Sequence, residues 1–431
     1  MTTTGATTFA PASEDLTIVD NKLFKAICLH QILDPTKGRN RYYRSALLAV
    51  MWLSLSMQIT QLVGLYFAVN DLQRFAFTTT TVTNAFQCLS KGYIIMTHAD
   101  RLRASLETAR YDFTSCGARD QRIVRRSRNV LSTVLRTFIV LSWVTCFIWA
   151  LTPLFGMDEY LQVTNADGTF TRYRVTIYNV WLPVPATVYN ATAVWALVYS
   201  AEVIVCFVNV FSWLLFDSYV VTMCFTFNAQ FRTVSASCAT IGHGDCSGSP
   251  SPHATGTHNI IRDDNNILNC YDELINHIKD NQSIIKKCDD FFEIIKPAIL
   301  FQIIGGSYSV ITLIFLTLLT YLMGFSIISI PVLKVFFGFL SVTFELFMYC
   351  YVFNHIETEK CKMNFGMYSC NWTAMDLKFK KTLLFAMNNN SAHRRVMKVT
   401  PKSIINLEMF SNVMNMSYSI VSVLLNSRVQ K

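Results

Sequence analysis

The chain has 431 residues, of which 52% are hydrophobic and only 15% charged, and its mean hydropathy is +0.32. A soluble chain of this length would carry about 25% charged residues and divide into two or three domains. The composition therefore excludes that class and favours one polytopic membrane domain. The net charge of +9 does not indicate nucleic-acid binding, because in a membrane protein the location of charge matters more than its sum.

Seven stretches are apolar enough to be membrane-spanning helices, which need about 20 residues each. They are Ser45–Val69, Gln73–Thr97, Asn129–Phe155, Ala193–Phe227, Lys296–Leu322, Ser329–Phe353 and Ser403–Ser427. The second is the weakest, with "TTTTVTNAFQ" in its middle. The fourth exceeds the thickness of a bilayer, so we expect it to continue out of the membrane as helix. The predicted fold class is an all-α membrane protein with seven transmembrane helices.

Lysine and arginine residues in the connections predict the orientation of these spans, because cytoplasmic loops carry the excess of positive charge. The connections on one side hold 28 of the 37 Lys and Arg residues, and those on the other side hold five. The first set comprises residues 1–44, 98–128, 228–295 and 354–402. This asymmetry predicts a cytoplasmic N-terminus and an extracellular C-terminus, the reverse of a G-protein-coupled receptor.

Glycosylation sequons give a different signal. Asn281, Asn371 and Asn389 begin sequons on the predicted cytoplasmic side, and only Asn190 begins one outside. Such tripeptides often arise by chance, whereas the charge asymmetry sums over many residues, so we follow the charges. None of the 13 cysteines lies in an extracellular connection, and no disulfide is expected there.

The cytoplasmic connection 228–295 has two parts. The tract "TIGHGDCSGSPSPHATGTH" lacks core-forming residues and is typical of disorder; its three histidines and one cysteine are a weak candidate for metal binding. An apolar seam at alternating steps of three and four follows, interrupted by Asn281, and it comprises Ile267, Tyr271, Leu274, Ile278, Ile285, Cys288, Phe292 and Ile295. Such a seam packs either on a partner helix or on the extension of the fourth span.

The connection 354–402 contains a second amphipathic segment. Trp372, Met375, Phe379 and Leu383 share one face, and three lysines surround it. The segment either lies flat on anionic lipid or packs with the seam helix as a cytoplasmic helical anchor region. Pro401, with Thr400 as N-cap, is expected to begin the last span.

The last span carries a polar stripe along its whole length. Glu408, Asn412, Asn415, Ser419, Ser422 and Asn426 follow one another at steps of four, three, four, three and four, and therefore share one face. Unpaired polar groups in hydrocarbon cost several kcal/mol each. The stripe therefore either hydrogen-bonds to neighbouring helices or borders a water-filled lumen shared by several copies. We favour the lumen, which apolar Val423 and Leu424 could close by dewetting.

Aromatic and small polar residues gather in the predicted outer half of the other spans, which is typical of a pocket for a small apolar ligand. Each aromatic alone is better explained as an interface anchor. The candidate ligand-binding residues are Phe77, Thr80, Asn84, Phe86, Trp143, Phe147, Trp149 and Tyr199, with Gln87, Lys91 and Trp195 nearby.

Intramembrane charges suggest an alternative function. Glu202 and Glu345 could pair inside the bundle and serve a proton-coupled transporter, whereas Arg136 is expected to reach the cytoplasmic surface. The sequence shows no inverted repeat to support a transporter. It also lacks the catalytic motifs of common enzymes, and it indicates no cofactor.

The C-terminal third resembles the insect odorant receptor family. The resemblance is carried by "FELFMYCYVFNHIETE", "YSCNWTAMDLKFKKTLLFAMNNN" and "VTPKSIINLEMFSNVMNMSYSIVSVLL", with Tyr368, Trp372, Phe410 and Ser417-Tyr418-Ser419 as its marked positions. The Thr-Tyr…Gln-Phe ending typical of the related gustatory receptors is missing. The chain is similar to an odorant-tuning subunit more than to the shared co-receptor, whose cytoplasmic insertion is longer.

This resemblance implies seven spans with the N-terminus inside, in agreement with the charge asymmetry. It further implies an odorant-gated, non-selective cation channel in the plasma membrane of a sensory neuron dendrite, forming a heterotetramer with a co-receptor subunit. The last helix would line the pore, with Ser419, Ser422, Val423, Asn426 and Ser427 as candidate positions. A volatile ligand would bind in the outer half.

The expected organisation follows from these assignments. Its parts are a cytoplasmic N-terminal segment (1–44), the ligand-binding helices one to four (45–227), a loop with disordered tract and anchor helix (228–295), helices five and six (296–353), a cytoplasmic anchor segment (354–402), and the pore-lining helix with a short extracellular tail (403–431).

Overall fold

Long helices make up most of the computed structural model. It describes residues 18–19, 24–25, 27–33, 38–69, 71–115, 121–156, 160–164, 170–180, 182–243, 257–322, 329–392 and 404–429. The longer helices are α3 (Gly38–Phe67), α4 (Leu72–Thr97), α6 (Gln121–Phe155), α8 (Thr192–Thr240), α9 (Thr257–Leu322), α10 (Ile330–Tyr368), α11 (Leu377–Ala392) and α12 (Leu407–Val429). The shorter elements are α2 (Leu29–Leu33), α5 (Ala99–Ser105), η2 (Leu106–Ala109), η3 (Tyr111–Phe113), β1 (Tyr160–Thr164), β2 (Phe170–Arg174), α7 (Ala186–Tyr189) and η4 (Trp372–Ala374).

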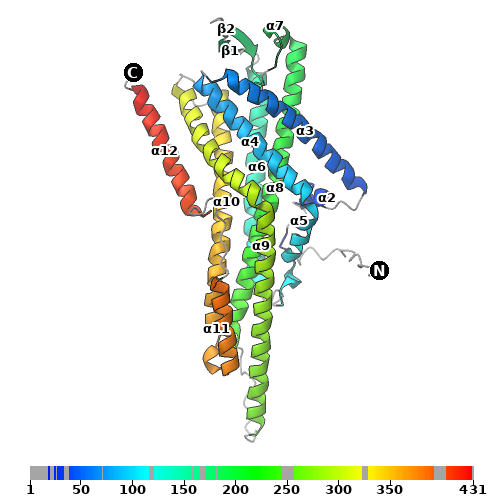
Figure 1. The fold of residues 1–431 in the computed structure, drawn as a ribbon, viewed down its shortest axis with the longest axis vertical. Helices are drawn as coiled ribbons and strands as arrows, with labels where there is room; N and C mark the ends of the chain where they lie inside the picture. The colour runs from blue at the N-terminus through cyan, green and yellow to red at the C-terminus, as the bar shows by residue number, and fades with distance from the viewer. Residues whose placement is uncertain are drawn as a thin grey trace.

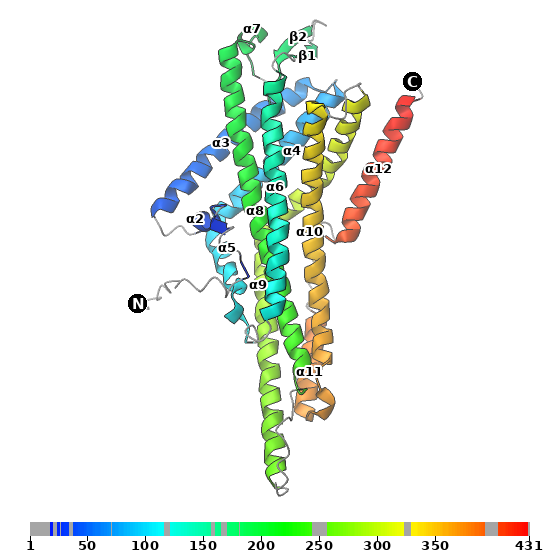
Figure 2. The same ribbon diagram turned by 180° about the vertical axis from the view of Figure 1, so that it is seen from behind.

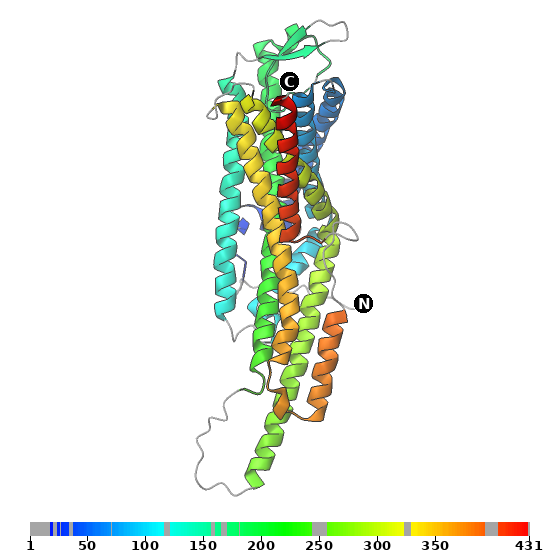
Figure 3. The same ribbon diagram turned by 90° about the vertical axis from the view of Figure 1, so that its left-hand side faces the viewer.

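The helices form an elongated bundle with two distinct ends (Figure 1). We name them the hairpin end, where β1 and β2 lie, and the α11 end, where α11 lies beside α9 and α10 (Figures 1 and 3). Helices α6, α8 and α10 run nearly parallel to the long axis, while α3 and α4 cross the bundle obliquely. Helix α9 changes direction along its length, and Pro297 lies within it, where the missing N–H removes one helical hydrogen bond.

Helix α8 is the centre of the bundle. Residues 214–231 are buried on every side, as expected for a helix that is apolar all round. Beyond Phe227, where the predicted span ends, the helix continues to Thr240, so the prediction that it would continue as helix is confirmed. Tyr219 and Phe227 of α8 both contact the ring of Phe291 on α9. This packing joins the two longest helices of the described chain.

Five helices are long and apolar enough to cross a membrane, considering the described residues and judging by length and composition only. These spans lie in Arg41–Tyr66, Arg122–Phe155, Thr192–Thr240, Asn269–Leu322 and Ile330–Tyr368. The other two predicted spans are also helical, as α4 and α12, but they fall outside this set. Both carry the polar residues that lower their hydropathy. The structure and composition therefore give a multi-pass, mostly helical membrane protein.

The seam packs within the chain. Its members Leu274, Cys288 and Ile295 are fully buried, and Phe292 contacts Phe353 of α10. The second amphipathic segment forms η4 and α11 and buries Phe379 and Leu383 against the same bundle. Two interpretations were open for each segment. In the described residues, both segments pack on other helices of the same chain.

Two expectations concern residues outside the described part of the chain. Cys246 and His253 of the proposed metal cluster lie there, as does the side chain of His258, while His243 contacts the carbonyl of Ser369 through Nε2. Thr400 and Pro401 also lie outside the described residues. Helix α12 begins at Leu407, later than predicted, and Asn406 Oδ1 caps it by accepting a hydrogen bond from the Met409 amide.

Helix α12 stands at the flank of the bundle, beside α10 and the upper part of α9 (Figures 1 and 2). Phe410 near its start meets Phe347 of α10 edge to face, with ring centroids 5.5 Å apart. Ser417 is fully buried on the inner face of α12, while Met416 and Tyr418 are exposed. One side of α12 therefore packs on the chain, and its other side is open.

Candidate ligand cavity and polar core

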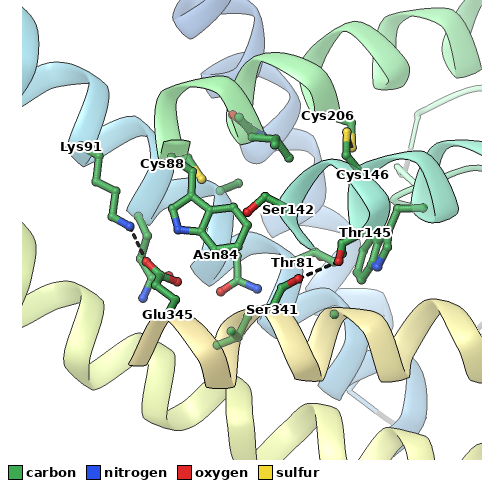
Figure 4. A pocket seen from close by; sticks show the side chains of 18 of the residues that line it. Thr81, Asn84, Cys88, Lys91, Ser142, Thr145, Cys146, Cys206, Ser341 and Glu345 are labelled. Atoms are coloured by element: carbon green, nitrogen blue, oxygen red, sulfur yellow. Dashed lines mark hydrogen bonds and ion pairs between the residues drawn. The ribbon is translucent and has the colours of Figure 1, made fainter. Parts of the chain in front are cut away.

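A cavity of about 120 Å³ lies between α4, α6, α8, α9 and α10 (Figure 4). Its wall contains aromatic rings, thiols, hydroxyls and amides. The lining residues include Asn84, Gln87, Cys88 and Lys91 of α4, Ser142, Thr145, Cys146 and Trp149 of α6, Cys206, Asn209 and Trp213 of α8, Gln302 and Leu313 of α9, and Gly338, Ser341 and Glu345 of α10. Tyr178, from the segment that follows β2, also lines it.

Asn84 and Trp149 are the two predicted ligand residues that line this cavity. The Asn84 side chain points into it (Figure 4) and accepts a hydrogen bond from Ser309 Oγ at 2.9 Å. Phe77 lies behind the wall and stacks on Trp149, with centroids 5.8 Å apart. Thr80 is buried and hydrogen-bonds Thr312 of α9 at 2.7 Å.

The other predicted residues lie elsewhere. Trp143 and Phe147 of α6 cluster with Phe207 of α8, and 51% of Phe147 is exposed. Tyr199 donates a hydrogen bond to the Ala150 carbonyl at 2.7 Å and stacks on Trp195. Phe86 is half-buried and is not among the lining residues. These four residues do not meet in one pocket.

A buried ionic cluster lies at one side of the cavity. Lys91 Nζ is 2.6 Å from Glu345 Oε1 and 2.8 Å from Asp217 Oδ1, and Tyr349 donates a hydrogen bond to Asp217 at 2.5 Å. The cluster joins α4, α8 and α10, and all four side chains are buried. The expected pairing of Glu202 with Glu345 is therefore wrong. Glu345 has the ammonium of Lys91 as its partner, which offsets part of the cost of burying a carboxylate.

Glu202 instead fastens the segment that follows β2. Its carboxylate accepts hydrogen bonds from Thr176 Oγ1 at 2.9 Å, the Tyr178 amide at 3.2 Å and the Val180 amide at 3.4 Å. We call residues 175–180 the cap segment, because it follows β2 at the hairpin end and contains Tyr178, which lines the cavity. The cap segment turns at Asn179, whose φ is +53° and whose side chain accepts from the Thr176 amide.

Lys334 of α10 holds the cap segment from the opposite side. Its ammonium donates a hydrogen bond to the Ile177 carbonyl at 3.0 Å and lies 4.7 Å from the ring centre of Trp149 and 5.0 Å from that of Phe77. The electron-rich faces of these two rings stabilise the buried ammonium of Lys334 by cation–π interaction. At the end of α7, burial raises the pKa of the Tyr189 phenol to about 12, so this phenol stays neutral.

Sulfur and hydroxyl groups complete the wall. Cys146 Sγ and Cys206 Sγ are 3.8 Å apart across α6 and α8, and Thr145 and Ser341 hydroxyls are 2.6 Å apart across α6 and α10 (Figure 4). Among the residues that the structure describes, no group of three or more metal-ligating side chains is found. The wall can therefore offer hydrogen bonds and dispersion contacts to a small organic molecule.

The stripe of α12 is exposed along most of its described length. Glu408, Asn412, Asn415 and Ser419 are exposed and Ser422 is half-buried. The hydroxyls of Ser419 and Ser422 donate to carbonyls of their own helix, at Asn415 and Tyr418. Val423 is 67% exposed, and the side chains of Asn426 and Ser427 lie outside the described part. Within the described residues the stripe thus faces away from the neighbouring helices.

Four residues of this region were missed from the sequence. Asp217 and Lys334 are charged residues inside apolar stretches, and the rule that intramembrane charges deserve a functional hypothesis would have found both. Gln302 and Tyr178 carry no such signal. Their roles depend on which helices meet and on how the cap segment folds back, and the local periodicity of the sequence predicts neither.

Comparison with known proteins agrees with this architecture. The family profile described as 7tm Odorant receptor matches residues 71–418. Odorant receptor 2a of Drosophila melanogaster is 30% identical over 90 residues, which are 21% of this chain and only 22% of that relative's length.

Two solved structures share the fold. The insect olfactory receptor OR5 from Machilis hrabei in complex with eugenol matches with a TM-score of 0.74 at 11% identity, covering 94% of this chain and 98% of OR5. A second OR5 structure matches with a TM-score of 0.73 at 11% identity, covering 94% and 97%. Because the family profile covers most of its length, the chain belongs to the 7tm odorant receptor family.

Proposed function

We propose that the chain is the odorant-tuning subunit of a ligand-gated, non-selective cation channel. A volatile molecule binds in the cavity and favours an open state by its higher affinity for that state. The observation that carries the proposal is the cavity itself, a buried site with a mixed polar and apolar wall in a member of the odorant receptor family. OR5, which shares the fold, was solved with eugenol bound.

The conducting path in this proposal runs along α12. Seven helices cross the plasma membrane with the N-terminus in the cytoplasm, and copies of α12 from this chain and a co-receptor surround one axis. The exposed polar stripe supports this arrangement, because polar groups facing lipid would be costly. Ser419, Ser422, Val423, Asn426 and Ser427 then line the pore. An exposed N-terminal tag that antibody reaches on intact cells would contradict this orientation.

Electrophysiology tests the proposal directly. Cells that express this chain together with an insect odorant co-receptor are expected to show inward cation current when volatile alcohols, esters, terpenes and phenols are applied. Cells with the co-receptor alone provide the control. Surface expression of both chains without any ligand-evoked current beyond the control would overturn the proposal.

The alternative is a proton-coupled transporter that uses Glu202 and Glu345. The two carboxylates belong to separate networks, one with the cap segment and one with Lys91, which favours structural roles for both. Substrate uptake that Glu345→Gln abolishes, in the absence of channel-like conductance, would favour the transporter.

A further inference from the structure

Gln302 of α9 presents an unpaired acceptor at the cavity. Only 2% of the residue is exposed, and it lines the cavity. Its Oε1 atom is buried, and no protein group hydrogen-bonds to it among the described residues. Buried amide oxygens are normally hydrogen-bonded, and an unpaired one at a cavity wall is satisfied when a bound molecule supplies the donor.

The nearby donors are committed to other partners. Gln87 Nε2 donates to the backbone carbonyls of Phe301 and Gln302 at 3.2 and 3.5 Å. Lys91 Nζ is held between Asp217 and Glu345. For either group to reach Gln302 Oε1, it would have to abandon hydrogen bonds that it already makes. The unpaired acceptor is therefore a stable feature of the wall.

Asn84 provides the complementary group. Its Oδ1 accepts from Ser309, while its Nδ2 has no hydrogen-bond partner in the described part of the chain. Helices α4 and α9 run side by side, with Asn84 opposite Ser309 and Gln87 opposite Gln302. The side-chain amides of Asn84 and Gln302 therefore lie at adjoining turns of the cavity wall. The wall thus offers one donor and one acceptor to a single ligand.

The size of the cavity limits that ligand. The cavity of about 120 Å³ is somewhat smaller than an apolar protein cavity of about 150 Å³ that accommodates benzene, so its ligand has at most about one ring or a short chain. A molecule this small in this space contacts opposite walls at once. Its polar group therefore meets the amides while its apolar body meets Trp149, Trp213 and Leu313.

We infer that this cavity selects small hydroxyl-bearing volatiles and that Gln302 is the residue that distinguishes them. A ligand O–H donates to Gln302 Oε1, and the same oxygen accepts from Asn84 Nδ2. An aldehyde or ester has no hydrogen for Gln302, and an ammonium has no lone pair for Asn84. This inference rests on the proposed function, because it names the chemical class of the ligand at the same site.

The test compares ligands of equal shape. Purified full-length chain in detergent is equilibrated with benzyl alcohol, ethylbenzene, benzaldehyde and benzylamine, and with hexan-1-ol against heptane, and the bound fraction is measured by gas chromatography. The wild type is expected to bind each alcohol at least ~10-fold more tightly than its hydrocarbon isostere, since sites built to hydrogen-bond a hydroxyl reject the analogue that lacks it. In Gln302→Leu the preference is expected to fall below ~3-fold, with little change in hydrocarbon binding.

Ile304→Leu is the matched control, because Ile304 lies on the same helix, is 60% exposed and does not line the cavity, and the exchange preserves volume. It should keep the preference for alcohols. Equal binding of alcohol and isostere by the wild type, a preference for benzylamine or benzaldehyde, or an alcohol preference retained in Gln302→Leu would each overturn the inference. Binding needs no current, so alcohol-selective binding without any gated current contradicts the proposed function alone, and gated current without alcohol selectivity contradicts this inference alone.

Discussion

Lys91 on α4 and Glu345 on α10 lie 2.6 Å apart in the interior of the bundle, next to the cavity. Asp217 of α8 contacts the same ammonium, so one cation holds three helices. With all three groups ionised, the cluster has one negative charge more than it has positive charge. The lysine is therefore the member whose loss leaves the largest uncompensated charge, while either carboxylate can be neutralised with a neutral pair remaining.

The first prediction concerns the charge balance of this cluster. Lys91→Met leaves two carboxylates facing one another in the bundle and is expected to destabilise the protein by about 3–5 kcal/mol, the usual result of breaking a buried ion pair. Glu345→Gln leaves Lys91 with Asp217 and should cost less, about 1 kcal/mol. Thermal unfolding of the purified chain in detergent and surface expression both measure the difference.

Lys91→Met combined with Glu345→Gln serves as the control, because it leaves one carboxylate unpaired rather than two. Its stability should lie between those of the two single variants. Equal damage from Lys91→Met and Glu345→Gln would contradict the charge balance, and would indicate that packing of the side chains matters more than their charge.

The second prediction concerns the cap segment. Glu202→Ala removes the acceptor for Thr176, Tyr178 and Val180, and hydrogen bonds to a charged group contribute about 1.5–3 kcal/mol each. The cap should open more often, so ligand-evoked currents should decay at least about 10-fold faster after washout, a ratio that corresponds to about 1.4 kcal/mol. Patch-clamp recording with rapid solution exchange checks this rate.

Glu202→Gln keeps one acceptor oxygen and should change the rate of decay less than Glu202→Ala does. Lys334→Met removes the hydrogen bond to Ile177 from the opposite side and should accelerate decay as Glu202→Ala does. Unchanged kinetics in both Glu202→Ala and Lys334→Met would mean that the cap segment does not control ligand release.

The third prediction concerns the contact between α4 and α9. A Cβ atom at Gly305 would lie 2.2 Å from Gln87 Nε2 and 2.9 Å from Thr83 Cγ2, so Gly305→Ala forces the Gln87 side chain to move and breaks its hydrogen bond to the Phe301 carbonyl. A destabilisation of about 1–3 kcal/mol is expected. Gly306→Ala is the control, because its Cβ would meet only Gln302 Nε2 at 3.4 Å. That variant should be neutral or more stable, since alanine favours helix by about 1 kcal/mol. Thermal unfolding of both variants gives the comparison, and equal losses would refute the close approach at Gly305.

Sequence patterns predicted the helices better than they predicted the partners of polar residues. The predicted span Gln73–Thr97 differs from α4 by one residue at its start, where the Asp71 side chain caps the helix. The sequence predicts that the last span begins at Ser403, but α12 begins at Leu407. The prediction is four residues early because Pro401 is a stronger signal of a helix start than Asn406. Local chemistry thus determines where most helices begin and end.

Pairing across helices depends on tertiary structure. Glu202 and Glu345 both looked like intramembrane carboxylates in need of a partner, yet one receives backbone amides from the cap segment and the other receives Lys91. Phe147 belongs to the predicted aromatic group, but the rotation of α6 turns it outward, where 51% of it is exposed. The hydrophobic periodicity of a sequence does not predict how a helix is rotated about its axis relative to four neighbouring helices.

The last prediction concerns the open face of α12. Ser419 is exposed on the stripe, whereas Ser417, two residues earlier, is fully buried against the chain. If the stripe borders water in the assembled channel, Ser419→Cys should react with a charged, membrane-impermeant thiosulfonate and the reaction should alter ligand-evoked current. Ser417→Cys should remain unmodified, because a buried thiol is screened from a charged reagent. Parallel measurement in chains in which Cys361, the exposed cysteine among the described residues, is replaced by serine lowers the background. Modification of Ser417→Cys with Ser419→Cys unreactive would mean that α12 turns its other face to the pore. Protection of both would place the stripe against protein or lipid, and the ion path would then have to be sought on another helix.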